Sequence, residues 1–128
     1  MAAVLKAHMG GIPVTADNGD AFYAFIFKEK PELKAFFALS DFKEQGLKTL
    51  TAVKSCVDTF GDDAAFKAYM AELMGKHKGP KFANLTAAHF DAFFKLWCTY
   101  TKANAEQQAA WQALSAKFVA EAKANGIN

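Results

Sequence analysis

The stretch that decides the fold is Asp62-Asp-Ala-Ala-Phe66-Lys-Ala-Tyr69-Met70-Ala-Glu-Leu73-Met74-Gly-Lys-His77. Its large apolar residues recur at intervals of three and four, which is the spacing of one face of an α-helix. Four residues beyond Leu73 the same face reaches His77, so the spacing predicts an imidazole that points toward the core. An inward histidine either hydrogen-bonds within the core or binds a metal, and the stretch alone leaves both open.

Glycine and proline divide the rest of the sequence into segments with helical spacing, and no segment shows the alternation of a strand. The segments are unequal in length, and about seven helices are more than a plain four-helix bundle contains. The sequence therefore predicts an all-α fold that forms one domain over residues 1–128. We expect helices at residues 2–9, 17–30, 31–37, 41–60 and 62–77, and two more that begin after Thr86 and Asn104.

The composition indicates a globular chain with no nucleic-acid partner. Apolar residues make up 52% of it and phenylalanine alone occurs 13 times, which is enough to form a sizeable core. The net charge is only +2 and every basic residue is lysine, so the arginine fork that reads bases and clamps phosphates is absent. No stretch is a signal peptide or could span a bilayer, so we expect a cytoplasmic protein with no membrane partner. Cys56 and Cys98 lie in apolar helical patterns, and we expect buried free thiols, as in a reducing compartment.

Three further polar side chains fall on faces that should be apolar. Gln45 and Thr49 share the line of Val53 in the helix expected at 41–60, and Tyr23 lies on the apolar face of the helix expected at 17–30. Each alone is compatible with an ordinary core or boundary position. Together with His77 they indicate a cavity that has a possible metal ligand on one wall and neutral hydrogen-bonding groups on another.

At these residues the sequence resembles a globin, over nearly the whole chain. The motifs that carry the resemblance are Phe27-Lys-Glu-Lys-Pro31-Glu-Leu-Lys-Ala-Phe-Phe37, Glu44-Gln45-Gly46-Leu-Lys-Thr49-Leu-Thr-Ala, Glu72-Leu73-Met-Gly-Lys-His77-Lys-Gly and Ala88-His-Phe90-Asp-Ala-Phe93. The first is similar to the globin proline corner and the phenylalanine that wedges the haem, the second to the distal helix, and the last two to the proximal helix and the start of the next.

The pairing of Tyr23 with Gln45 is most like invertebrate globins, including those of nematodes and of the nerve or body-wall type. Within that family the first helix of this chain is short. Only seven residues separate Phe37 from Gln45, so we expect a globin-like helical sandwich with a very short loop between the third helix and the distal helix.

The resemblance implies reversible binding of dioxygen and other diatomic gases at a five-coordinate haem b (iron protoporphyrin IX), for oxygen storage or transport and without enzymatic activity. It places His77 on the iron, whereas His89 falls in the first turn of its helix, at an expected solvent edge. The implied distal residues are Tyr23, Gln45 and Thr49, and the implied haem contacts are Phe37, Lys48, Leu73, Phe90 and Phe93. A monomer or a weak homo-oligomer is expected.

Several alternatives stay open at this point. The chain could be a haem enzyme, such as a nitric-oxide dioxygenase or a weak peroxidase, a gas sensor, or a haem-free helical module. Efficient peroxide cleavage is disfavoured because neither a distal histidine nor an arginine is available. Thr49 could accept a hydrogen bond from Tyr23 or bond to its own helix carbonyl. Lys48 could reach a haem carboxylate or be merely solvated.

Overall fold

The computed structural model describes residues 1–37, 41–79 and 82–128, and every regular element in these ranges is a helix. The elements are α1 (Ala2–Gly10), α2 (Ala16–Glu29), the 3-10 helix η1 (Pro31–Phe37), α3 (Phe42–Thr59), α4 (Asp63–Gly75), α5 (Ala87–Tyr100) and α6 (Ala105–Ala124). This confirms the all-α class and the short first helix. The short loop expected before the distal helix falls on residues 38–40 and lies outside the described residues.

Side-chain caps set several of the helix starts where the sequence predicts them. The Asp41 carboxylate accepts from the backbone N–H of Lys43 at 3.0 Å, and the Asp62 carboxylate accepts from that of Ala65 at 3.1 Å. A capping box also starts α6, because Asn104 and Gln107 each accept from the other's backbone N–H, at 2.8 and 2.9 Å.

The end of α4 differs slightly from the prediction. The helix was expected to run to about His77, but it ends at Gly75 with Lys76 as its C-cap. Two further turn bonds follow, from the N–H of Lys76 to the carbonyl of Leu73 at 3.1 Å and from the N–H of His77 to that of Met74 at 3.0 Å. The tightening of the last turn is the usual way to satisfy the final carbonyls. His77 therefore still continues the apolar face of α4.

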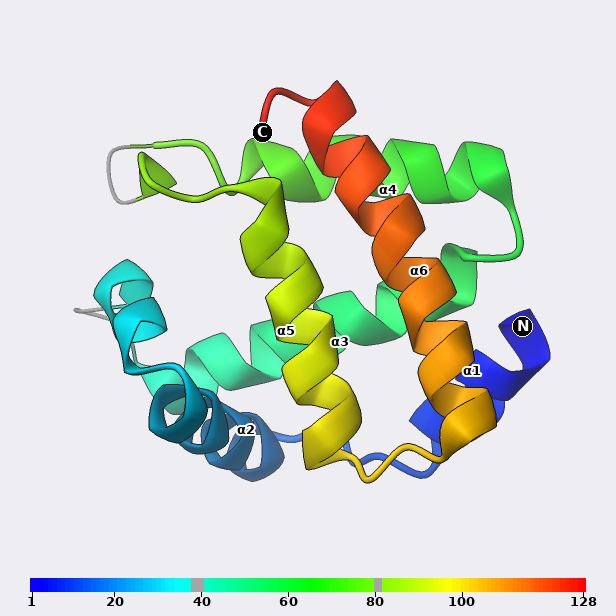
Figure 1. Ribbon diagram of the computed structural model, residues 1–128, viewed down its shortest axis with the longest axis horizontal. Coiled ribbons are helices and arrows are strands. Elements are labelled where there is room, and N and C mark those ends of the chain that lie inside the picture. Colours follow the sequence, from blue (N-terminus) through cyan, green and yellow to red (C-terminus); the bar gives the residue numbers. More distant parts are fainter. Residues whose placement is uncertain (38–40, 80–81) are drawn as a thin grey trace.

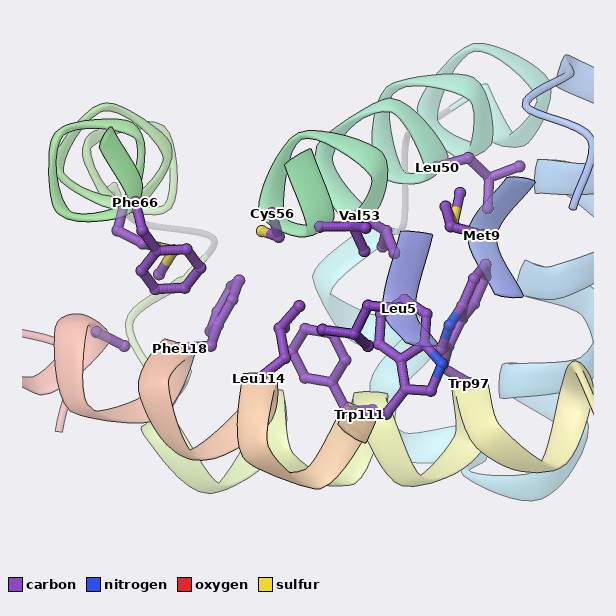
Figure 2. Close-up of a cluster of buried hydrophobic side chains, with 14 of the residues drawn as sticks. Leu5, Met9, Leu50, Val53, Cys56, Phe66, Trp97, Trp111, Leu114 and Phe118 are labelled. Atoms are coloured by element: carbon purple, nitrogen blue, oxygen red, sulfur yellow. The ribbon is translucent and has the colours of Figure 1, made fainter. Parts of the chain in front are cut away.

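The helices pack as a sandwich. Figure 1 shows α5 and α6 side by side, with α3 passing behind them and α4 crossing near one end of α6. Figure 2 shows the core between these layers, where labelled side chains of α3 face Trp111, Leu114 and Phe118 of α6. Trp111 is fully buried and its Nε1–H donates to Nδ1 of His8 at 2.8 Å. This bond ties α1 to α6 and gives the half-buried His8 a structural role.

Two glycines allow α2 and α3 to cross at very short range. A Cβ atom on Gly19 would come within 2.3 Å of the carbonyl carbon of Gly46, and a Cβ on Gly46 within 2.4 Å of that of Gly19. No side chain larger than hydrogen fits at either position without moving a backbone. The crossing fixes the spacing of the two helices one turn before Tyr23 and Thr49. The sequence analysis did not anticipate it.

Both cysteines are free, as predicted, although they differ in exposure. Cys56 is buried in α3, and burial raises the pKa of its thiol to about 12, so the thiol stays protonated and unreactive. Cys98 was also expected to be buried, but it is only half-buried in α5. None of the helices in the described ranges is both long enough and apolar enough to cross a membrane.

Candidate functional site

A cavity of about 650 Å³ lies between α2, η1, α3, α4 and α5. Volumes of about 300–1,000 Å³ are typical of small-molecule and cofactor sites. All nine residues that the sequence singled out for the site line it: Tyr23, Phe37, Gln45, Lys48, Thr49, Leu73, His77, Phe90 and Phe93. The helical sandwich thus gathers one set of side chains from five elements that are far apart in the sequence.

His77 is held by its own helix in a defined tautomer. Its Nδ1 lies 2.9 Å from the carbonyl oxygen of Leu73. A carbonyl only accepts, so Nδ1 carries the proton and Nε2 carries the ring's lone pair. The ring is half-buried and packs against Phe82 and Phe90, with centroid distances of 5.3 and 5.7 Å. A backbone bond at one ring nitrogen is how metal-binding histidines are commonly oriented.

Tyr23 of α2 and Thr49 of α3 form another polar part of the cavity wall. The Tyr23 hydroxyl lies 2.6 Å from the Thr49 hydroxyl, and the Gln45 side chain is close enough to lower the pKa of the Tyr23 phenol. Thr49 thus contacts Tyr23, and either hydroxyl could be the donor, whereas its neighbour Thr51 donates to the helix carbonyl of Leu47 at 2.7 Å. Burial raises the pKa of the Tyr23 phenol, an effect that its hydrogen bonds to Thr49 and Gln45 only partly offset. Tyr23 therefore keeps its proton at neutral pH and is available as a donor.

An aromatic cluster fixes the position of the Tyr23 ring. Phe37 of η1 packs edge-on against it with a centroid distance of 5.0 Å, and Phe27 and Phe42 follow at 5.6 and 6.0 Å. Aromatic pairs at these distances add attraction beyond the burial of apolar area. The hydroxyl of Tyr23 is thereby aimed at α3 by packing as well as by hydrogen bonding.

Two lysines mark the open side of the cavity. Lys48 lies 3.2 Å from the carboxylate of Glu44, and Lys76 lies 3.8 Å from that of Glu72, each one helical turn away. Both lysine side chains are strongly exposed, at 67% and 72%. Exposed pairs of this kind contribute little, so either lysine can exchange its partner at small cost.

Sequence reasoning missed several residues that line the cavity. Ser55 continues the face of Lys48 after seven residues, and Tyr69 precedes Leu73 by four, so helical spacing could have found both. Burial raises the pKa of Tyr69 to about 12. His89 was expected at the solvent edge; it is half-buried and also lines the cavity. Its position depends on a cap hydrogen bond that helical spacing does not reveal.

A helical sandwich whose cavity is lined by a backbone-held imidazole, a hydroxyl and an amide is typical of all-α haem proteins. The sequence pattern of the Globin family matches residues 20–122, and the chain belongs to that family. A myoglobin of Ascaris suum is 30% identical over 120 residues, covering 81% of this chain and 78% of the relative. A globin-like protein of Caenorhabditis elegans is 28% identical over 123 residues, or 84% of this chain and 76% of the relative.

Solved structures give the same result. A high-resolution structure of a globin-like protein of Caenorhabditis elegans superposes with a TM-score of 0.84 at 26% identity. The match covers 97% of this chain and 90% of the other. The predicted globin-like fold and the likeness to invertebrate, nematode-like globins are therefore confirmed.

Proposed function

We propose that the chain binds haem b in the cavity between α3 and α4 and binds dioxygen reversibly there, with His77 as the protein ligand of the iron. The observation that supports the proposal is the bond from His77 Nδ1 to the Leu73 carbonyl at 2.9 Å, because it favours the tautomer whose Nε2 lone pair can bind a metal. The haem supplies an iron with an open position for a diatomic gas. The apolar wall residues Leu73, Phe90 and Phe93 suit the flat face of a porphyrin.

The distal residues would bind the gas by hydrogen bonding. A hydrogen-bond donor aimed at a gas ligand that carries partial negative charge would hold that ligand and slow its release. Tyr23 and Gln45 can each donate, while Thr49 competes for the tyrosine proton at 2.6 Å. In this proposal Thr49 lowers the oxygen affinity, because it occupies part of the hydrogen-bonding capacity of the Tyr23 hydroxyl. Phe37 packs against Tyr23 and would contact the haem edge.

The visible spectrum of the purified chain after addition of haem tests the proposal. We expect a Soret band, a five-coordinate ferrous form, and a spectrum that changes reversibly when dioxygen is added and removed. No Soret band after haem addition would contradict haem binding and favour a haem-free helical module. Irreversible oxidation on the first exposure to dioxygen would contradict reversible carriage.

We further propose oxygen storage or transport, as opposed to enzymatic turnover, as the role of this site. The absence of arginine from the whole sequence and the glutamine at the distal position support it, because peroxide cleavage benefits from a distal base and a cation. Steady-state assays with peroxide, or with nitric oxide and a reductant, should show no sustained turnover. Turnover at rates typical of enzymes, which have a median kcat of about 10 per second, would overturn this assignment.

The cellular setting and the assembly state belong to the same proposal. The free thiols of Cys56 and Cys98 are in keeping with a reducing compartment, and we propose the cytoplasm. We also propose a monomer or a weak homo-oligomer. Sedimentation of the haem-loaded chain across a range of concentrations tests this, and a tight dimer at the lowest concentration would contradict it.

A further inference from the structure

The cavity holds a second histidine, whose tautomer is set opposite to that of His77. Nδ1 of His89 lies 2.9 Å from the backbone nitrogen of Thr86, which can only donate. Nδ1 of His89 is therefore unprotonated, and the ring's proton lies on Nε2. The Thr86 hydroxyl, 3.2 Å from the same nitrogen, can donate to it as well. His77 thus presents a lone pair at Nε2, whereas His89 presents an N–H group.

The two imidazoles belong to one aromatic wall. His89 meets the ring of Phe36 edge-on at 5.3 Å, Phe36 stacks with Phe82 at 6.4 Å, and Phe82 packs against His77 at 5.3 Å. All four side chains line the cavity. Because Nδ1 of His89 is turned toward the first turn of α5, Nε2 lies on the ring edge away from that turn. Among the described residues, no side chain or backbone group hydrogen-bonds to this Nε2–H.

We propose that His89 donates its Nε2–H to a carboxylate of the haem, and that Thr86 is the positioning residue that keeps His89 in this tautomer. The inference rests on the haem binding proposed above. Protoporphyrin IX has its hydrogen-bond acceptors at the periphery, as two carboxylates, so a fixed donor in a cavity wall would meet them there. A hydrogen bond to a charged acceptor is stronger than one between neutral groups.

The lysines at the cavity mouth are weaker candidates for this role. The long side chains of Lys48 and Lys76 are exposed and lose rotamer freedom when fixed. The His89 ring is half-buried and already held by Thr86 and Phe36, so little further ordering is needed.

The same geometry argues against His89 as the iron ligand. To offer a lone pair at Nε2, His89 would have to move its proton to Nδ1 and lose the hydrogen bond from Thr86. The backbone N–H of Thr86 would then lack its partner at the helix start.

A purely structural role for His89 is the competing explanation, because its side chain caps a backbone N–H at the start of α5, as the Gln107 side chain does at the start of α6. Gln107 accepts from the Asn104 backbone N–H at 2.9 Å, the same distance as in the Thr86–His89 pair. The substitution Gln107→Leu therefore provides a matched control, since it removes an equivalent cap acceptor at a residue that does not line the cavity.

The decisive experiment measures the rate at which ferric haem leaves the loaded chain for an excess of apomyoglobin. It compares protohaem with its dimethyl ester, which lacks both carboxylates. We expect His89→Leu to lose protohaem about tenfold faster than the parent chain, and the dimethyl ester at the parent's rate. Gln107→Leu should leave both rates unchanged.

Three results would overturn the inference. If His89→Leu accelerates the loss of both haems equally, the residue acts only through the helix cap. If Lys48→Leu, and not His89→Leu, loses protohaem faster than the parent but loses the dimethyl ester at the parent's rate, the lysine is the carboxylate partner. Nitrogen-15 chemical shifts of the apoprotein that place the His89 proton on Nδ1 would refute the tautomer. A parent chain that takes up neither haem would instead contradict the proposed function, which keeps the two failures distinct.

Discussion

The substitution Thr49→Val tests how the distal wall sets oxygen affinity. Valine keeps the shape of threonine but removes the hydroxyl that lies 2.6 Å from the Tyr23 hydroxyl. Tyr23 is only 4% exposed, so its hydroxyl does not gain water as a replacement partner. The phenol then lacks its Thr49 partner, and its proton becomes available to the gas ligand.

The expected size of the effect follows from the bond that is removed. One hydrogen bond between uncharged groups contributes about 0.5–1.5 kcal/mol net, so a shift of about 1 kcal/mol toward the ligand-bound state is expected. This corresponds to about fivefold higher affinity, expressed as slower dissociation because hydrogen bonds to a bound ligand act mainly on its escape.

Stopped-flow measurement of dioxygen dissociation is the appropriate assay. The matched control is Thr51→Val on the same helix, because Thr51 also lines the cavity but donates to the Leu47 carbonyl at 2.7 Å. It should leave the dissociation rate unchanged. Adding Thr49→Val to a Tyr23→Phe background should also have no effect, since the proton that it would release is gone. An unchanged or faster dissociation rate in Thr49→Val would refute the reasoning.

Three further predictions concern the fold and its charges. Gly46→Ala should lower the free energy of unfolding in urea by about 2 kcal/mol or more, because the new Cβ meets the Gly19 backbone. Gly75→Ala should be tolerated, because its Cβ would have nothing within 4 Å, and equal stabilities of the two variants would contradict the close crossing. Oxygen affinity should be nearly flat between about pH 6 and 8, because Gln45 does not titrate and the pKa of Tyr23 is raised above 10.0 by burial; a steep dependence would mean that another group controls the site. The pKa of Asp91 is lowered from 3.8 by its hydrogen bonds to Lys95 and Ser115, which burial opposes, so the stability that Asp91 contributes is present above pH 3.8 and is lost as the pH falls through the lowered pKa. Asp91→Asn should therefore have a lower free energy of unfolding in urea than the parent at neutral pH, and the difference should shrink in acid. A difference that does not depend on pH would contradict this prediction.

Local patterns in the sequence were sufficient for much of the fold and for the main walls of the cavity. The caps Asp41, Asp62 and Asn104 act within three residues of themselves, so they can be read from the chain directly. The places of His77 and Thr49 in the cavity wall could be predicted, because helical spacing already assigns both residues to inward faces. Their chemical roles remain predictions.

Helical spacing gives the inward faces of Ser55 and Tyr69, but the other features that the sequence analysis missed depend on contacts between distant segments or on the direction of a single bond. The crossing at Gly19 and Gly46 joins residues from two helices, and neither glycine signals the other in the sequence. Ser55 and Tyr69 share the cavity only because α3 and α4 converge there. His89 has the spacing of a helix edge, and only its hydrogen bond with Thr86 shows which ring edge is turned away from the helix start.

The most direct measurement of the central claim is the visible spectrum of the haem-loaded His77→Gly variant, recorded in the ferrous form with and without added imidazole. Glycine leaves the space of the ring but supplies no ligand atom. We predict that the variant retains haem poorly and lacks the five-coordinate ferrous spectrum of the parent, and that added imidazole restores both this spectrum and reversible dioxygen binding. A variant that holds haem and takes up dioxygen like the parent, without imidazole, would show that another residue holds the iron.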